Sequence, residues 1–478
     1  MDGSRRTTSI HILDDDSLLH VFYLYRSFLL GEDQDDRARL YGGDRGWIRG
    51  RWWYRLAHVC QRWRNIILGS ASHLGLSLVC THGTPVADML AHSPPLPLVL
   101  DYFRYDHDIT AEDGEGLLLA LKQRDRILRI RLSAHASQQK FIAAMDEEYS
   151  ILEYLVIVRP VPFCDSTILI FPESLQAPHL RHLRLQGFAL PIGSQLLMTA
   201  VGLVTFSLVM VHPSTYFHPN TLLQWISLMP QLEILSAGFM FSIPNRDVER
   251  QLRHTPIIAP ITLPNLRYFD FQGVSTYLEA LVHRITTPRL KKLKINFFNQ
   301  LTLSVPRLLQ FIGATENLRF SKAIFTFSDK NVGAAVYPHE ETKVYALGIV
   351  IKCCHLDWQV SCVAQIFNSL TQIFSTVERL GLQYSKHSES SEGHNEADST
   401  EWRKFFRPFS NVKTLRIDNG LVEDLSHCLE LEDGELPLEL LPELQELTYF
   451  ASGDTGDEFT SFINARRNAG RPVTLVRR

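Results

Sequence analysis

The sequence lacks the features expected of a secreted protein. No Asn-x-Ser/Thr sequon occurs in its 478 residues, and residues 1–20 are polar and acidic, without the apolar segment of a signal peptide. The seven cysteines are an odd number for so long a chain, which does not favour a disulfide framework. These absences predict a reducing, intracellular location, either cytoplasmic or nuclear.

The chain also lacks a strong charge of either sign. Its 48 basic and 52 acidic residues give a formal net charge of -4, so no overall field attracts nucleic acid or an anionic membrane. Arginines interleave with Trp and Tyr between residues 45 and 64, a mixture that can stack on bases. Acidic residues at 32–36 lie close by, so we expect a solvated face there and no nucleic-acid partner.

A long stretch without charge runs from Leu185 to Leu232. Its most apolar part, from Leu196 to Val211, is shorter than the roughly 20 residues of a transmembrane helix. Helix-breaking residues precede it, and Pro213 follows it. We therefore expect a buried strand and no membrane partner.

Catalytic and cofactor motifs are missing as well. The sequence has no Gly-x-Ser-x-Gly elbow, no phosphate-binding loop and no His-Glu-x-x-His helix, so we expect neither an enzyme nor a cofactor. Cys353, Cys354, His355 and Cys362 do not have the spacing of a structural zinc site. We expect no metal at these residues, which adjoin a predicted strand.

What the sequence does contain is a recurring triplet of apolar residues with the spacing Leu-x-x-Leu-x-Leu. Clear copies begin at Leu180, Leu266, Leu290, Val377 and Val412, and weaker copies begin at Leu128, Leu152, Leu203, Leu232, Leu318, Val344 and Leu444. One such unit cannot bury its apolar face alone, whereas stacked copies can. Residues 73–478 therefore predict an α/β fold, an irregular leucine-rich-repeat solenoid with parallel strands and outer helices.

Helical patterns lie between the predicted strands, for example at residues 220–228, 278–285 and 305–312. A helix and a last strand at 457–476 read as a capping unit. Residues 386–400 are polar and predict a mobile loop.

Alternation along the predicted strands identifies a candidate substrate surface. If the triplet leucines point inward, the residues between them line the concave face. These are His182, Arg184 and Gln186; Tyr268, Asp270 and Gln272; Lys292, Lys294 and Asn296; and Thr414, Arg416 and Asp418. They carry both signs of charge and do not specify a ligand, so the protein substrate stays unknown.

Residues 9–72 show no repeat and predict helices interrupted by a Gly- and Arg-rich insertion near 31–51. One helical pattern follows Asp14, and a second runs from Tyr54 to Gly69. The apolar residues that carry these two patterns are Leu13, Leu18, Leu19, Val21, Phe22, Leu56, Val59, Cys60 and Trp63.

This region resembles an F-box, in which a Leu-Pro-x-x-x-Leu-Leu helix precedes a Val-Cys-basic-x-Trp element. Asp14 stands where that family usually has proline, and the insertion is longer than usual. With the repeats, the whole chain resembles the basidiomycete F-box-like proteins with irregular leucine-rich repeats.

The resemblance implies an adaptor. The nine apolar residues named above would bind a Skp-type linker protein or support the binding surface, and the linker would attach the chain to a cullin ubiquitin ligase. The repeats would hold the substrate close to the ligase. The alternative is a free-standing repeat module that binds protein and whose helical cap has no link to a ligase.

Overall fold

The computed structural model describes most of the chain. The described residues are 13–30, 51–103, 109–133, 139–159, 169–212, 216–240, 259–298, 304–315, 318, 320–339, 341–342, 344–385, 398–430, 439–450 and 458–478. Residues 31–50 of the insertion predicted near 31–51, and residues 386–397 of the loop predicted at 386–400, lie outside them.

The protein is α/β, and among the described residues sixteen strands form one mostly parallel sheet. The chain divides into two compact units. Unit 1 comprises Met1–Leu183 and Gly193–Ala200, and unit 2 comprises Arg184–Ile192 and Val201–Arg478. No helix in the described part of the chain is both long enough and apolar enough to cross a membrane.

Unit 1 begins with helices and continues with alternating strands and helices. Its elements are α1 (Asp15–Leu30), α4 (Trp52–Ala57), α5 (Gln61–Gly69), β1 (Leu78–Cys80), α6 (Val86–His92), β2 (Leu98–Tyr102), α7 (Ala111–Leu121), the 3₁₀ helix η2 (Arg124–Arg126), β3 (Ile127–Ser133), α8 (Gln139–Ala143), β4 (Tyr154–Val158), β5 (Leu169–Ile170) and α9 (Gln195–Thr199). Strands β1, β2, β3 and β4 pair in parallel in that order. Strand β6 (His182–Gln186) spans the division between the units.

Two predictions for the start of unit 1 need correction. The pattern expected as one helix from Tyr54 to Gly69 is two helices, because the chain turns at residues 58–60 between α4 and α5. The alternation of Leu74, Leu76 and Leu78 with other residues also predicts a strand over residues 74–79, and the structure confines this strand to β1. Leu74 and Leu76 are nonetheless buried, packed from a turn in which Gly75 has a φ of +59°, a conformation that favours glycine.

Unit 2 repeats the strand-and-helix alternation. Its elements are β7 (Phe188–Ala189), β8 (Thr205–Val211), α10 (Pro219–Ser227), β9 (Ile234–Phe239), β10 (Ile261–Thr262), β11 (Tyr268–Gly273), α12 (Ser275–Val282), β12 (Ile285–Thr286), β13 (Lys292–Phe297), α13 (Pro306–Ala314), β14 (Lys322–Ser328), β15 (Asn331–Tyr337), β16 (Leu347–Lys352), α14 (Leu356–Asn368), α15 (Thr371–Phe374), β17 (Arg379–Ser385), α16 (Ser399–Phe406), β18 (Thr414–Ile417), the 3₁₀ helix η6 (Asn419–Leu421), α17 (Val422–Leu429), β19 (Glu446–Tyr449), α18 (Thr460–Asn468) and β20 (Thr474–Arg477).

The apolar triplets explain these strands. In the copies at 266 and 290, the first leucine is fully buried just before the strand, and the next two apolar residues are buried within β11 and β13. The stretch expected as a buried strand near 203 forms β8. Truncating one of these leucines to alanine removes core contacts worth roughly 2–5 kcal/mol.

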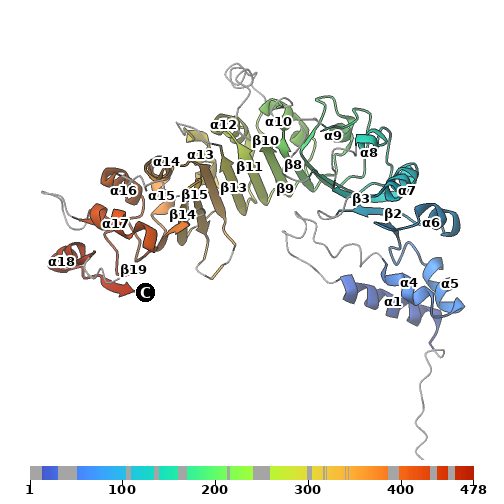
Figure 1. The fold of residues 1–478 in the computed structure, drawn as a ribbon, viewed down its shortest axis with the longest axis horizontal. Helices are drawn as coiled ribbons and strands as arrows, with labels where there is room; N and C mark the ends of the chain where they lie inside the picture. The colour runs from blue at the N-terminus through green and yellow to red at the C-terminus, as the bar shows by residue number, and fades with distance from the viewer. Residues whose placement is uncertain are drawn as a thin grey trace, which may run out of the picture. The chain divides into compact units, whose positions relative to one another are not determined.

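Helices cover one face of the unit 2 strands. Figure 1 shows α10, α12, α14 and α16 along the same side of the sheet. Phe325 of β14 lies edge-to-face with Phe367 of α14 and Phe405 of α16, at centroid distances of 5.1 and 4.9 Å. We call the opposite side of the unit 2 strands the open face.

The strand order of unit 2 departs from the prediction of parallel strands stacked in chain order. Strands β13 to β18 follow the spatial order β13-β16-β15-β14-β17-β18. Strand β15 is antiparallel to both β14 and β16, and the β14–β15 turn closes on Ser328, whose hydroxyl accepts the Asn331 N–H at 3.1 Å. The segment β14 to β16 therefore enters the sheet in reverse order.

One end of the predicted loop at 386–400 also differs from expectation. Asp398 caps α16 by accepting the Thr400 N–H at 3.0 Å. Residues 398–400 are therefore the start of a helix, because a carboxylate at this position satisfies a free amide of the first turn.

Candidate protein-interaction surfaces

Helix α1 has one face in the core of unit 1. Leu18 and Phe22 are buried, and the Phe22 ring meets Trp63 of α5 edge-to-face at 4.9 Å. Arg62 of α5 donates hydrogen bonds to the Leu13 carbonyl at 2.6 Å and to the Asp15 carboxylate at 2.9 Å, and so links α5 to the start of α1. The nearby helices α4 and α5 therefore fix the orientation of α1.

The start of α1 shows what Asp14 does where the resembling family has proline. Its carboxylate accepts the Ser17 N–H at 2.7 Å, and this hydrogen bond lowers the pKa of Asp14. Asp14 thus caps the helix.

The outer side of α1 is apolar and exposed. Val21, Leu24 and Phe28 recur at helical spacing, with exposed fractions of 44%, 54% and 83%. We call these three residues the α1 apolar face. A cluster of large apolar side chains on a small helical region is unusual unless a partner covers it.

The structure separates the predicted linker-binding residues by burial. Leu18 and Phe22 are buried, Leu19, Leu56, Cys60 and Trp63 are half-buried, and Leu13, Val21 and Val59 are exposed. Leu18 and Phe22 therefore support α1 from inside. Sequence reasoning missed Leu24 and Phe28, although a helix that is apolar on every side is itself a sign that a second surface needs covering.

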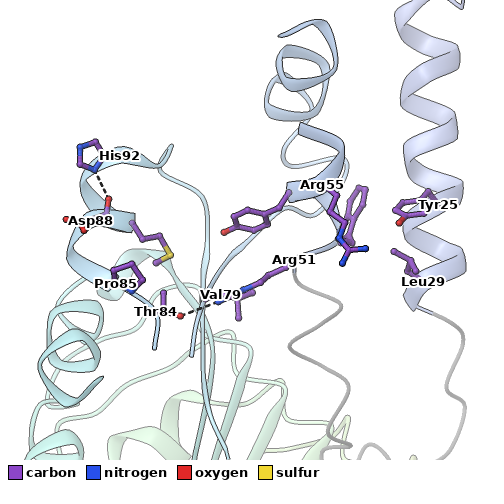
Figure 2. A pocket seen from close by; sticks show the side chains of 12 residues that line it. Tyr25, Leu29, Arg51, Arg55, Val79, Thr84, Pro85, Asp88 and His92 are labelled. Atoms are coloured by element: carbon purple, nitrogen blue, oxygen red, sulfur yellow. Dashed lines mark hydrogen bonds between the residues drawn. The ribbon is translucent and has the colours of Figure 1, made fainter. Parts of the chain in front are cut away.

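A pocket of about 800 Å³ lies beside α1 in unit 1. Figure 2 shows Tyr25 and Leu29 of α1 on one side, Arg51 and Arg55 in the middle, and Pro85, Asp88 and His92 on the other. Arg51 donates to the Val79 carbonyl and to the Thr84 hydroxyl, both at 3.2 Å. The pocket is thus built where the helices meet the first strand-and-helix unit.

The open face of unit 2 brings two predicted trios together. Strands β11 and β13 are direct neighbours, with Tyr268 paired to Lys292 and Asp270 to Lys294. Lys294 forms an ion pair with Asp270 at 3.1 Å, and the Lys292 ammonium lies 5.1 Å from the Tyr268 ring centre. Tyr268 is buried, so it supports Lys292 instead of lining the surface as expected.

The other two trios lie apart from this pair. In β6, His182, Arg184 and Gln186 alternate with buried leucines, and β8 and β9 separate β6 from β11 in the strand order. Arg416 of β18 is exposed, whereas Asp418 follows the strand and accepts the Tyr384 N–H at 3.4 Å. The predicted trios therefore do not form one continuous site.

The cysteines near residue 353 take different positions. Cys353 is buried, Cys354 is exposed and Cys362 lies on α14. Burial raises the pKa of Cys362 to about 11, so this thiol is protonated at neutral pH. Within the described ranges, no group of three or more His, Cys, Asp or Glu side chains is arranged to hold a metal ion.

Comparison with known proteins adds no relative. No protein-family model matches the chain, and a search of curated proteins finds no significant match.

Proposed function

We propose that the chain is an F-box-like protein with irregular leucine-rich repeats, acting as the substrate-recruiting adaptor of a Skp-cullin-F-box type ubiquitin ligase. The N-terminal helices would bind the Skp-type linker, and the open face of the strands would bind a protein substrate. The adaptor itself would carry out no bond chemistry.

One observation carries the proposal, namely the α1 apolar face. It lies within the segment whose sequence resembles an F-box, and α1 is held by Phe22 and Arg62 so that Val21, Leu24 and Phe28 point outward. Burying one such side chain against a partner contributes about 1.5–3 kcal/mol. Three on one helix make an anchor of the kind found at the centre of protein interfaces.

An adaptor works by raising effective concentration. A substrate lysine held near the ligase reacts as if tethered, which raises its rate without any catalytic group in the adaptor. The absence of a catalytic motif from the sequence agrees with such a role.

The test is co-expression of the full chain with a Skp-type linker, followed by size-exclusion chromatography. The wild-type chain should co-elute with the linker. The double variant Leu24→Asp, Phe28→Asp should weaken binding by more than about a hundredfold, because two apolar anchors become charged.

A matched control places the same change elsewhere. Ile192 and Met198 are exposed apolar residues outside α1, so Ile192→Asp with Met198→Asp should leave co-elution intact. Loss of binding in both double variants, or no co-elution of a folded wild-type chain, would overturn the proposal. Leu18 and Phe22 are unsuitable for this test because they are buried, and Trp63 is unsuitable because it packs against Phe22.

The rival function is a free-standing repeat module with a helical cap. It is favoured by the contact between α4 and the segment that leads into β1, since the Trp53 indole donates to the Ser77 carbonyl at 3.2 Å. The two functions differ in stable binding to the linker, which the co-elution experiment measures directly.

A further inference from the structure

The strongest unassigned feature is the distribution of charge over six neighbouring strands of unit 2. Strands β13, β16, β15, β14, β17 and β18 contain no Asp or Glu. Their charged residues are Lys292, Lys294, Lys352, Lys322, Arg379 and Arg416. The chain as a whole has more acidic than basic residues, so this region departs from the overall composition.

Strand register places all six cations on the open face. Phe325 of β14 points toward the helices. Side chains alternate between the two faces of a strand, so Lys322, three residues away, lies on the open face. Lys322 pairs with Arg379, and Gly381 with Arg416. In β13 and β16, the buried residues Ile295 and Ile349 are paired and face the helices. Lys294 and Lys352 are an odd number of residues away from them, so they lie on the open face. We call the six residues the cationic row.

Aromatic rings hold several of these cations in place. The Lys292 ammonium is 4.4 Å from the Tyr345 ring centre, Lys322 is 5.4 Å from Tyr337, and the Arg416 guanidinium is 4.6 Å from Phe450. A ring face orients a cation without neutralising its formal charge. The side chains are thus ordered before an anionic partner arrives, which reduces the entropy lost on binding.

The floor of the cationic row is uncharged. Gly333, Ala335 and Gly381 lie on the open face near the centre of the six strands, with Ile324 between Ala335 and Gly381. Nothing but ordinary van der Waals neighbours would meet a side chain added at Gly333 or Gly381. A polypeptide backbone can therefore approach the strands between the cations.

Carboxylates mark both ends of the cationic row. Asp270 lies on β11, next to β13, and forms an ion pair with Lys294 at 3.1 Å, while Glu446 lies on β19, next to β18. Five strand spacings of about 4.8 Å give the row a width of roughly 24 Å, which matches about seven residues of extended peptide. A longer uniform polyanion such as nucleic acid would meet a carboxylate at each end, whereas a short acidic segment would not.

We infer that the cationic row binds a short acidic segment of a protein. Carboxylates of the segment pair with the cations of the row other than Lys294, which already forms an ion pair with Asp270. The inference names the substrate class for the open face, and it rests on the proposed function only in treating the bound protein as a ligase substrate.

The test uses the full chain and a fluorescein-labelled copolymer of glutamate and tyrosine, with binding followed by fluorescence anisotropy. Saturable binding that weakens with salt is expected. The double variant Lys322→Glu, Arg416→Glu should weaken it by about tenfold or more, since two attractive contacts become repulsive. The neutral pair Lys322→Gln, Arg416→Gln should lose less, which separates charge from misfolding.

The matched control moves the same charge change to the helices. Arg407 and Arg467 are exposed on or beside α16 and α18, so Arg407→Glu with Arg467→Glu should retain binding. Equal loss in both charge-reversal pairs would overturn the inference, because total charge would then be responsible. Absence of copolymer binding, or stronger binding of single-stranded oligothymidine of equal charge, would overturn it too.

The outcome is independent of the linker experiment. Lys322→Glu with Arg416→Glu should co-elute with the Skp-type linker like the wild type, and Leu24→Asp with Phe28→Asp should bind the copolymer normally. Failure of one proposal is therefore distinguishable from failure of the other.

Discussion

Charged residues on the strands include a buried ion pair in unit 1 and accessible cations in unit 2. In unit 1, Arg131 of β3 is directly paired with Asp101 of β2, both side chains are buried, and they form an ion pair at 3.0 Å. Arg131 also lies 4.9 Å from the Phe103 ring centre. In unit 2, Lys322 of β14 and Arg416 of β18 also lie on strands but remain accessible to solvent.

The difference in burial separates charges that stabilise the fold from charges that can bind a partner. The charges of a buried ion pair have already lost their water and face each other within the fold, so removing one of them affects stability. Accessible cations held by rings contribute little to stability and keep their charge for a ligand. We therefore expect the effect of a substitution on stability to fall from buried to exposed groups.

The largest effect is expected at the buried pair. Arg131→Ala leaves the Asp101 carboxylate buried without its cation and should lower the free energy of unfolding by about 3–5 kcal/mol. Urea unfolding followed by circular dichroism measures this loss. Adding Asp101→Ala to Arg131→Ala should recover part of the stability, and a loss below about 1 kcal/mol in the single variant would contradict this account.

A half-buried carboxylate should give an intermediate effect. Glu279 of α12 accepts the N–H groups of Arg307 and Leu308 at 2.9 and 2.8 Å and so caps α13. Glu279→Ala should cost about 1–2 kcal/mol, as for loss of other helix caps. Burial raises the pKa of Glu279, so Glu279→Gln, which keeps an acceptor without the charge, should cost less in the same unfolding measurement.

A histidine cap should make stability depend on pH. His218 accepts the Asn220 N–H through Nδ1 at 3.1 Å, and burial lowers its pKa below the ordinary 6.5. The unfolded chain then binds the proton more readily, so the contribution of His218 is present above pH 6.5 and is lost as the pH falls below that value. His218→Asn should reduce this loss in thermal unfolding followed between pH 5 and 8, whereas an unchanged pH profile would contradict the assignment.

The smallest effect is expected at the cationic row. Lys322→Ala and Arg416→Ala should each change the free energy of unfolding by less than about 0.5 kcal/mol. A loss comparable to that of Arg131→Ala would remove the distinction between structural and binding charges.

The strands that could be predicted from the sequence are those formed by the apolar triplets. The triplets at 266 and 290 form β11 and β13 because their apolar spacing matches strand alternation and their leucines fill the core. The reversed order of β14 to β16 was not predictable in this way. Strand β15 buries Val332 and Val336 without a leucine triplet, and its two neighbours are chosen by pairing across the sheet.

The candidate surfaces were predicted only in part. Val21 was expected at the linker-binding surface, but Leu24 and Phe28 were not. Their exposure follows from which side of α1 packs on Trp63, a tertiary contact. The cationic row likewise depends on register, because Lys322 and Arg379 are far apart in the sequence and adjacent only in the sheet.

Hydrogen–deuterium exchange of the full chain, with and without a Skp-type linker, measures directly whether α1 binds the linker. We expect slower exchange in residues 15–30 on addition of the linker, with no change in the peptides that contain β13 to β18. Unchanged exchange in residues 15–30, or protection confined to the strands of unit 2, would contradict the assignment of α1 to the linker and of the open face to the substrate.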